Sequence, residues 1–165
     1  MKANLKENTN SLNPYKYHSP DNSGISFHFA TSNNFGYSIA LHDCSDLFGV
    51  PENCNSRLMF LVLTPIKPPT IIPRDNRVRD TVVHFIMDFL AKNKDVIFYV
   101  CSNKDQQEKV RSRLFTDWFK KYKSPNIERE MKMVDNSETY FIYHNDNSLA
   151  DAVLNAIDKY NSAGM

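Results

Sequence analysis

The chain has 165 residues, of which 41% are hydrophobic and 24% charged, and this composition is typical of one globular domain. It excludes a disordered chain, which would combine few aromatic residues with a high net charge. Twenty basic and nineteen acidic residues leave a net charge of +1, so no global field favours nucleic acid or an anionic membrane. We therefore expect no membrane association, and nucleic acid is disfavoured as a partner.

The N-terminal residues and the cysteines indicate the cellular compartment. The first residues include Lys2, Lys6 and Glu7 and lack the apolar core of a secretory signal, and the longest apolar runs are only strand-sized. We therefore expect a cytoplasmic protein. The three cysteines include no closely spaced pair, so we expect free thiols, with a bridge between Cys44 and Cys54 as the alternative in an oxidising compartment.

Residues 1–24 are rich in Asn, Ser, Lys and Pro, and we expect them to form a poorly ordered lead-in to a single domain over residues 25–162. The domain opens with two segments in which apolar residues alternate with polar or small ones, as in the strands of a hairpin. One pairing, 25 with 41, 27 with 39 and 29 with 37, places six apolar side chains on one face: Ile25, Phe27, Phe29, Tyr37, Ile39 and Leu41. Asn33 and Asn34 supply the turn, because Asn tolerates the left-handed conformation.

Two later segments, residues 57–64 and 96–101, are apolar on both faces, which is typical of central strands covered from both sides. Between them, Asp75 or Asn76 can cap a helix that ends near Asn93. The apolar positions of this helix follow helical spacing: Val78, Val82, Phe85, Ile86 and Phe89. Strand, helix and strand in this order predict a crossover unit with the two strands as neighbours.

The C-terminal part is predicted to contain two more helices and a second hairpin. One helix follows the capping residue Ser102 and has an apolar stripe that includes Trp118, and the last helix follows the capping residue Ser148. Alternating apolar residues predict the hairpin over residues 127–144, with its turn at residues 135–137.

These elements predict an α+β fold, a three-layer sandwich with a mixed sheet of about six strands and helices on both faces. The element order is βββαβαββα. Residues 57–64 and 96–101 are expected at the centre of the sheet, because they are the segments whose two faces are both apolar.

The distribution of glycine argues against a phosphate-binding site. The chain has only four glycines, and residues 50–163 contain none. A loop that holds a phosphate needs glycine, because backbone N–H groups must approach the anion without a Cβ in the way. A nucleotide-binding loop after either central strand is therefore excluded, and we expect no cofactor.

No group of side chains indicates a metal or a catalytic centre. His28 and His42 fall on the polar face of the first hairpin but about 13 Å apart along it, too far for one metal. His84 is expected within a helix and His144 at a turn. Cys101 ends a buried strand, where apolar surroundings disfavour a nucleophilic thiolate. We therefore predict no bound metal and name no catalytic residue.

One local patch is a candidate binding surface. Residues 104–123 carry seven basic and three acidic residues, a net charge of +4, and arginines near the start of the other central helix can extend the patch. The alternative is a solvated helix face with one or two arginines tied to carboxylates such as Asp75 or Asp80. The functional interpretation is a site for an anion or an acidic partner, which the planar fork of arginine suits. The candidate binding residues are Arg113, Lys120, Arg77, Arg111 and Asp75.

Arg111 and Arg113 are predicted to have different roles, because residues two apart on a helix point about 200° away from each other. Arg111 falls near the apolar side of its helix and is expected to be structural, with a carboxylate such as Asp75 as a candidate partner. Arg113 shares the basic face with Lys120 and is expected at the binding surface.

The predicted element order resembles that of the Gcn5-related acetyltransferases, a family that grips a coenzyme pyrophosphate with a glycine-containing turn. Residues 73–78 stand in place of that turn and contain no glycine. Val110 stands at the spacing at which that family often has a tyrosine acid. An acyltransferase-like enzyme that binds a coenzyme, or a degenerate relative of one, is therefore the alternative function.

A closer resemblance, over about residues 25–160, is to an uncharacterised family of small bacterial proteins. Four groups of residues carry it: Phe27-His-Phe29 with Thr31 and Tyr37; Asp75-x-Arg77-Val78 with Thr81-Val82; Tyr99-Val-Cys101; and Arg111-x-Arg113-Leu-Phe115 with Trp118-Phe119. This resemblance implies a shared fold and a bacterial cytosolic setting, and it brings no activity with it. We expect a non-catalytic binding or accessory module that recognises a protein partner, since a fold can outlive its sites.

Overall fold

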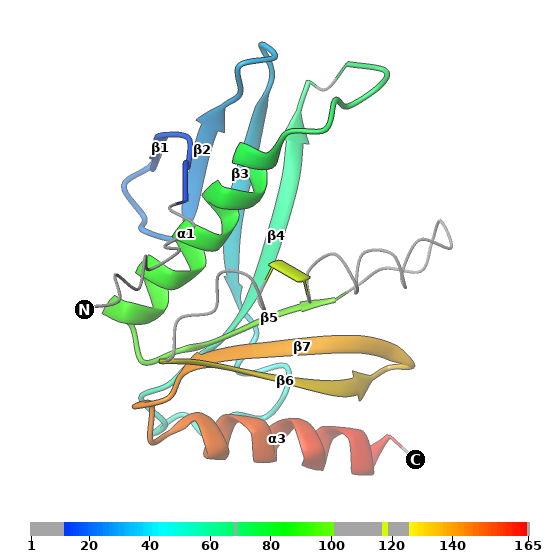
Figure 1. The fold of residues 1–165 in the computed structure, drawn as a ribbon. Coiled ribbons are helices and arrows are strands. Elements are labelled where there is room, and N and C mark those ends of the chain that lie inside the picture. Colours follow the sequence, from blue (N-terminus) through cyan, green and yellow to red (C-terminus); the bar gives the residue numbers. More distant parts are fainter. Residues whose placement is uncertain (1–11, 68, 101–116, 119–125, 165) are drawn as a thin grey trace, which may run out of the picture.

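The computed structural model describes residues 12–67, 69–100, 117–118 and 126–164. Within them, seven strands form one mixed sheet in the order β1-β2-β3-β4-β5-β7-β6 (Figure 1). The strands are β1 (Tyr17–His18), β2 (Ser26–Ala30), β3 (Gly36–Asp43), β4 (Leu58–Ile66), β5 (Val96–Val100), β6 (Ile127–Val134) and β7 (Ser137–His144). The predicted α+β class is confirmed, and β1 is the strand that the sequence analysis did not predict.

Two described helices cover opposite faces of this sheet. Helix α1 (Asn76–Lys92) links β4 to the parallel neighbour β5, as the crossover pattern predicts. Its Phe85 and Phe89 pack in one hydrophobic cluster with the β2–β4 side of the sheet. Helix α3 (Ala150–Ala163) packs in a second cluster, on the other face, over β5, β6 and β7 (Figure 1). The predicted helix after Ser102 lies outside the described residues, apart from residues 117–118.

The register of the first hairpin is the one that apolar alternation predicts. Phe27 pairs with Ile39 and Phe29 pairs with Tyr37 across β2 and β3. Asn34 adopts φ 61°, the left-handed conformation expected at this turn. The second hairpin turns through two residues with positive φ, Asp135 and Asn136, which match the twist of the flanking strands.

Strand β4 is covered on both faces only in its first part, which corrects the prediction for residues 57–64. Leu58 and Met59 are fully buried, whereas Phe60 and Val62 are partly exposed. The reason is that β4 pairs with β5 only from Leu58 to Phe60. Beyond this point the face opposite α1 no longer belongs to the cluster that α3 covers.

The ends of α1 agree with the sequence, whereas the start of α3 does not. Asp75 caps α1 and Asn93 ends it. Ser148 was expected to cap the last helix, but the side chain of Asn147 accepts the Leu149 N–H at 3.1 Å instead. Asn147 is buried, and its amide is satisfied there because it also donates to Ser56 Oγ, at 3.2 Å, and to a main-chain carbonyl before β5.

The domain begins earlier than Ile25, which corrects the expectation for residues 1–24. Tyr17 and His18 form β1 and pair with β2 at the edge of the sheet. Tyr15 is 7% exposed and belongs to the hydrophobic cluster beneath α1. We call residues 13–18 the arm. The arm has little apolar periodicity, because it contacts the domain mainly through main-chain groups and two aromatic rings.

Three further expectations concern single features. No helix among the described residues is long and apolar enough to span a bilayer. Cys44 and Cys54 are free thiols, and burial together with the nearby Asp43 charge raises the pKa of Cys44. Trp118, from the apolar stripe of the predicted helix, is partly buried, and the rest of this stripe lies outside the described residues.

The fold predicts a sharp contrast between two apolar residues of the second hairpin. Ile142 on β7 is fully buried, and Met133 on β6 is 51% exposed. Ile142→Ala should lower the free energy of unfolding by about 2–5 kcal/mol, because it leaves a cavity in the core. Met133→Ala should change it by no more than about 0.5 kcal/mol. Urea denaturation of both variants checks this, and equal losses would contradict the described core.

Candidate functional site

Of the five candidate binding residues, the structure describes two, and these two lie together. Asp75 and Arg77 lie at the start of α1, where both contact the arm. Arg111, Arg113 and Lys120 lie outside the described residues, so the basic patch and the predicted contact between Arg111 and Asp75 stay predictions. Two residues that the sequence analysis did not propose for binding, Asp80 and Thr81, complete the contacts with the arm. We call Asp75, Arg77, Asp80 and Thr81 the clamp.

Asp75 acts on the helix and on the arm at the same time. Its Oδ1 accepts the Arg77 N–H at 2.9 Å, which satisfies a free amide at the helix N-terminus. Its Oδ2 accepts the Tyr15 hydroxyl at 2.7 Å. A phenol has one hydrogen, so the Ser32 hydroxyl, 2.9 Å away, donates to the Tyr15 oxygen. The Ser32 N–H also donates to this oxygen, at 3.1 Å. The buried phenol is therefore fully hydrogen-bonded.

Arg77 binds the main chain and the aromatic ring of the arm. Its Nε donates to the Asn13 carbonyl and a terminal nitrogen donates to the Pro14 carbonyl, both at 3.1 Å. Its guanidinium carbon lies 3.9 Å from the centre of the Tyr15 ring, a cation–π contact. The planar fork of arginine suits two neighbouring carbonyls, so lysine could not replace these contacts.

Asp80 and Thr81 accept the two N–H groups that the arm presents to α1. Asp80 Oδ2 accepts the Asn13 N–H at 3.0 Å, while its other oxygen binds Arg79. Arg79, one of the arginines near the start of this helix, is thus paired with a carboxylate. Thr81 Oγ1 accepts the Tyr15 N–H at 2.8 Å and donates to the Arg77 carbonyl at 2.6 Å. Both side chains are buried.

Three of the clamp residues, Arg77, Asp80 and Thr81, bind every main-chain polar group from the Asn13 N–H to the Tyr15 N–H. The fourth, Asp75, binds the Tyr15 hydroxyl. Two N–H groups and two carbonyls of the arm have partners, and Pro14 has no N–H to satisfy. A buried main-chain group without a partner costs free energy, so this pairing explains why a segment without regular secondary structure can lie here. The clamp therefore has the chemistry of a site that reads an extended peptide.

Aromatic rings from the first hairpin form the floor beneath Tyr15. Its ring stacks on Phe29 at a centroid distance of 6.0 Å, and Phe29 stacks on Tyr37 at 5.4 Å. Burial and the negative charge of Asp75 raise the pKa of Tyr37 above its ordinary value. The Asp75 carboxylate thus lies close to the aromatic pocket, where the Tyr15 hydroxyl donates a hydrogen bond to one of its oxygens.

The comparisons place this site within a family. A model described as a family of unknown function (DUF6169) matches residues 74–159. The chain belongs to this family. The DUF6169 match begins one residue before Asp75 and so contains the whole clamp, whereas the arm precedes it. A comparison with curated proteins finds no match. The resemblance to an uncharacterised family is thereby confirmed, over a shorter stretch than residues 25–160.

Four groups of residues carried this family resemblance, and residues of two of these groups lie around the arm. Phe29 and Tyr37 form the floor of the Tyr15 pocket, and Thr31 is buried at the turn beside it. Asp75, Arg77 and Thr81 belong to the clamp. The sequence contained one signal for the missing partner, two tyrosines separated by a lysine in residues 15–17, but nothing that related them to a helix more than 60 residues away.

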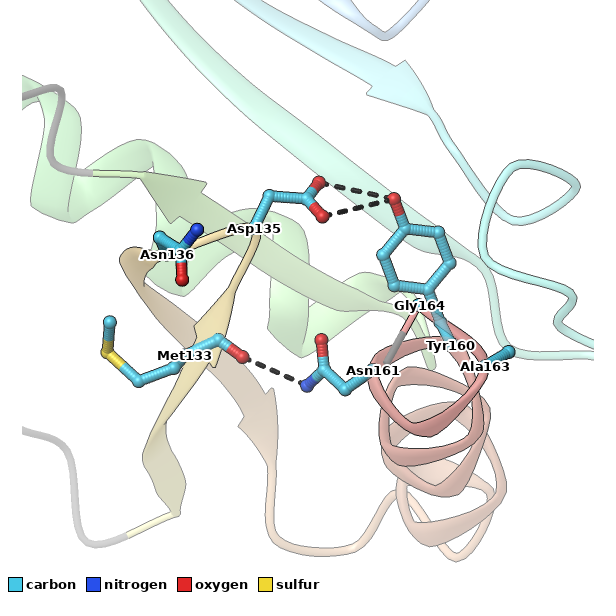
Figure 2. A pocket seen from close by; sticks show the side chains of 7 residues that line it. All are labelled: Met133, Asp135, Asn136, Tyr160, Asn161, Ala163 and Gly164. Atoms are coloured by element: carbon cyan, nitrogen blue, oxygen red, sulfur yellow. Dashed lines mark hydrogen bonds between the residues drawn. The ribbon is translucent and has the colours of Figure 1, made fainter.

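Away from the clamp, a hollow of about 570 Å³ lies between the β6–β7 turn and the end of α3. Figure 2 shows Asp135 and Tyr160 pointing toward each other across it, and the hydroxyl donates to both carboxylate oxygens, at 3.1 and 3.4 Å. This hydrogen bond raises the pKa of Tyr160. Asn161 donates to the Met133 carbonyl at 2.9 Å. These polar groups tie the hairpin to the helix, so the hollow has a structural explanation.

The histidines do not form a site in the described part of the chain. His18 and His28 face each other across β1 and β2, with ring centroids 6.1 Å apart. His84 accepts or donates one hydrogen bond with the Tyr17 hydroxyl at 3.1 Å, on the outer side of α1. Among the described residues, no three metal-binding side chains gather closely enough to hold an ion.

The site predicts that the arm stabilises the domain. Tyr15→Ala should lower the free energy of unfolding by about 3–5 kcal/mol, as for other buried large aromatic residues. The exposed neighbour Lys16 provides the matched control, and Lys16→Ala should change the value by no more than about 0.5 kcal/mol. Urea denaturation measures both. If Tyr15→Ala were as harmless as Lys16→Ala, the arm would not be held by the clamp.

Proposed function

We propose that the chain is a non-catalytic binding module that recognises a protein partner in the bacterial cytoplasm, and that the clamp is its recognition site. The observation that carries this proposal is the pairing of the arm's main chain, from the Asn13 N–H to the Tyr15 N–H, by side chains of α1. Main-chain hydrogen bonds give affinity for an extended segment, and a side-chain pocket beside them gives specificity. In this structure the arm occupies the site.

The geometry also supports a particular kind of segment. The pocket of Phe29 and Arg77 accepts an aromatic ring, and Asp75 accepts a hydroxyl at its far end. In the arm the residue before the aromatic ring is Pro14, which has no N–H that would need a partner. We therefore infer that the partner presents a tyrosine preceded by proline, with both in an extended conformation.

The charges of the clamp favour a protein over a nucleic acid as the partner. Asp75 and Asp80 contribute two carboxylates beside the guanidinium groups of Arg77 and Arg79, so the charges of these four groups balance. Nucleic-acid affinity comes mostly from cationic contacts to phosphate, and carboxylates oppose it. Main-chain carbonyls and N–H groups are dipoles, which a site of balanced charge can bind.

A synthetic peptide with the sequence of residues 12–18 tests the proposal. It should bind the full-length Tyr15→Ala variant and raise its thermal unfolding midpoint, because the weakened arm leaves the pocket open. The wild-type chain should bind the peptide at least about tenfold more weakly, because a tethered arm competes at an effective concentration in the millimolar range. Calorimetric titration and thermal unfolding give the two readouts.

Matched controls isolate the clamp in this experiment. A peptide with alanine in place of the first tyrosine should not bind, because it cannot fill the pocket. Adding Thr81→Val to the Tyr15→Ala variant should weaken binding, since it removes the acceptor for the tyrosine N–H. Adding Lys92→Ala, at the exposed end of α1, should not. If the folded Tyr15→Ala variant did not bind the peptide, the clamp would serve only its own chain.

A divergent acyltransferase-like enzyme is the second candidate, and the sheet favours it in one respect. The parallel pairing of β4 and β5 ends at Phe60 and Phe98, whereas β4 continues to Ile66. A coenzyme could lie where these strands part. The start of α1 weighs against it, because the Asp75 carboxylate already caps the helix N-terminus, where a pyrophosphate would meet a like charge.

Thermal unfolding with coenzyme A and acetyl-coenzyme A separates the two candidates. A ligand present at a hundred times its dissociation constant adds about 2.7 kcal/mol to the stability of the protein. We expect no such stabilisation by either compound. A saturable rise in the unfolding midpoint would favour the enzyme and count against the binding module.

A further inference from the structure

We propose that the protein partner at the clamp is a second copy of this chain, and that two copies exchange their arms. This inference rests on the proposed function, because it names the source of the segment that the clamp binds. In the exchanged form, residues 13–18 of each copy lie on α1 and β2 of the other. Each clamp then makes the same contacts as in a single chain.

The contacts of the arm are of the kind that exchange preserves. The arm binds residues far away in the sequence, at separations of 60 to 67 positions for Asp75, Asp80 and Thr81. None of these bonds depends on which copy supplies the arm. Exchange of an identical element therefore costs little in contact energy, and its balance is set by the connecting segment and by the concentration of protein.

The connecting segment, residues 19–25, is suited to act as a hinge. Residues 20–25 are exposed, and Asn22 and Gly24 have φ values of 54° and 73° in the closed turn. The side chain of Asp21 accepts hydrogen bonds from Ser19 and Ser23, so these bonds can move with the segment. Opening the turn relieves the left-handed conformation of Asn22, and strained hinge segments promote exchange. When fully extended, the seven residues of this segment span about 23–25 Å, which is how far an opened hinge can carry the arm.

The outer strand that the arm contributes is short enough to detach. Strand β1 consists of Tyr17 and His18 and pairs only with Phe29 and His28 of β2. A two-residue pairing adds little stability by itself. The arm is therefore held mainly by the clamp and by its rings, and both features are equally available on the second copy.

Two single cysteine variants of the full chain test the exchange. His18 and His28 are direct partners across β1 and β2, and directly opposed Cα atoms in antiparallel strands lie about 4.5–5.5 Å apart. This spacing suits a disulfide. His18→Cys and His28→Cys are mixed in equal amounts, incubated, oxidised in air and separated on a non-reducing gel. An exchanged arm places the two cysteines side by side in different chains.

We expect the mixture to form a covalent dimer of two 19.1 kDa chains, several-fold more abundant than in either variant alone or in the parent chain. The parent controls for the native cysteines. Adding Tyr15→Ala to His18→Cys should reduce the dimer, because it removes the ring that anchors the arm.

The double variant His18→Cys/His28→Cys separates the two ways in which the inference can fail. If it closes an internal disulfide while the mixture forms no excess of dimer, the arm stays in its own chain. Exchange is then overturned, and the clamp remains a recognition site. If neither sample forms the disulfide, the arm does not lie on β2, and the proposed function falls together with the exchange.

Discussion

A segment that packs against a domain can bury its main-chain hydrogen-bonding groups only if these groups find partners, and this constraint explains the site on α1. Three side chains near the start of the helix, those of Arg77, Asp80 and Thr81, meet this requirement from the Asn13 N–H to the Tyr15 N–H. Asp75 links this recognition to helix formation, because the same carboxylate caps α1 and holds the Tyr15 hydroxyl. Removing the Thr81 hydroxyl would leave the buried Tyr15 N–H unsatisfied, which costs about 1–3 kcal/mol. The arm and the start of the helix therefore depend on each other.

The sheet positions this site by dividing its cover between two helices. On one face α1 packs in a cluster that runs from the arm and β2 as far as β5 and β7, and on the other face α3 packs in a cluster over β5, β6 and β7. The arm extends the first of these clusters past β2, where Tyr17 packs edge-on against Phe27 and Phe85. Consequently the arm completes the border of the first cluster, and it can leave without exposing the second. This separation makes a docked segment compatible with a stable domain.

Local patterns of the sequence predicted the parts of the fold that local physics determines. The hairpin register followed from apolar alternation, because only one pairing places Phe27, Phe29 and their partners on the same face. The cap at Asp75 followed from its position before an amphipathic helix. The arm could not be predicted in this way, because its contacts join residues more than 60 positions apart. Arg77 was proposed to bind an anion or an acidic partner, whereas in the structure its guanidinium binds two carbonyls of its own chain, which carry no sequence signal.

The exchange rate of the Tyr15 amide hydrogen is the most direct measure of the clamp. This N–H donates to the buried hydroxyl of Thr81 at 2.8 Å, so its exchange in wild-type protein should be slow. Thr81→Val keeps the shape of the side chain and removes the acceptor, and it should bring the Tyr15 amide close to the rate of an unprotected one. The amide of Ile142, deep in the sheet, should stay protected in both proteins. A Tyr15 amide that exchanges in wild-type protein as fast as in an unfolded peptide would contradict the account.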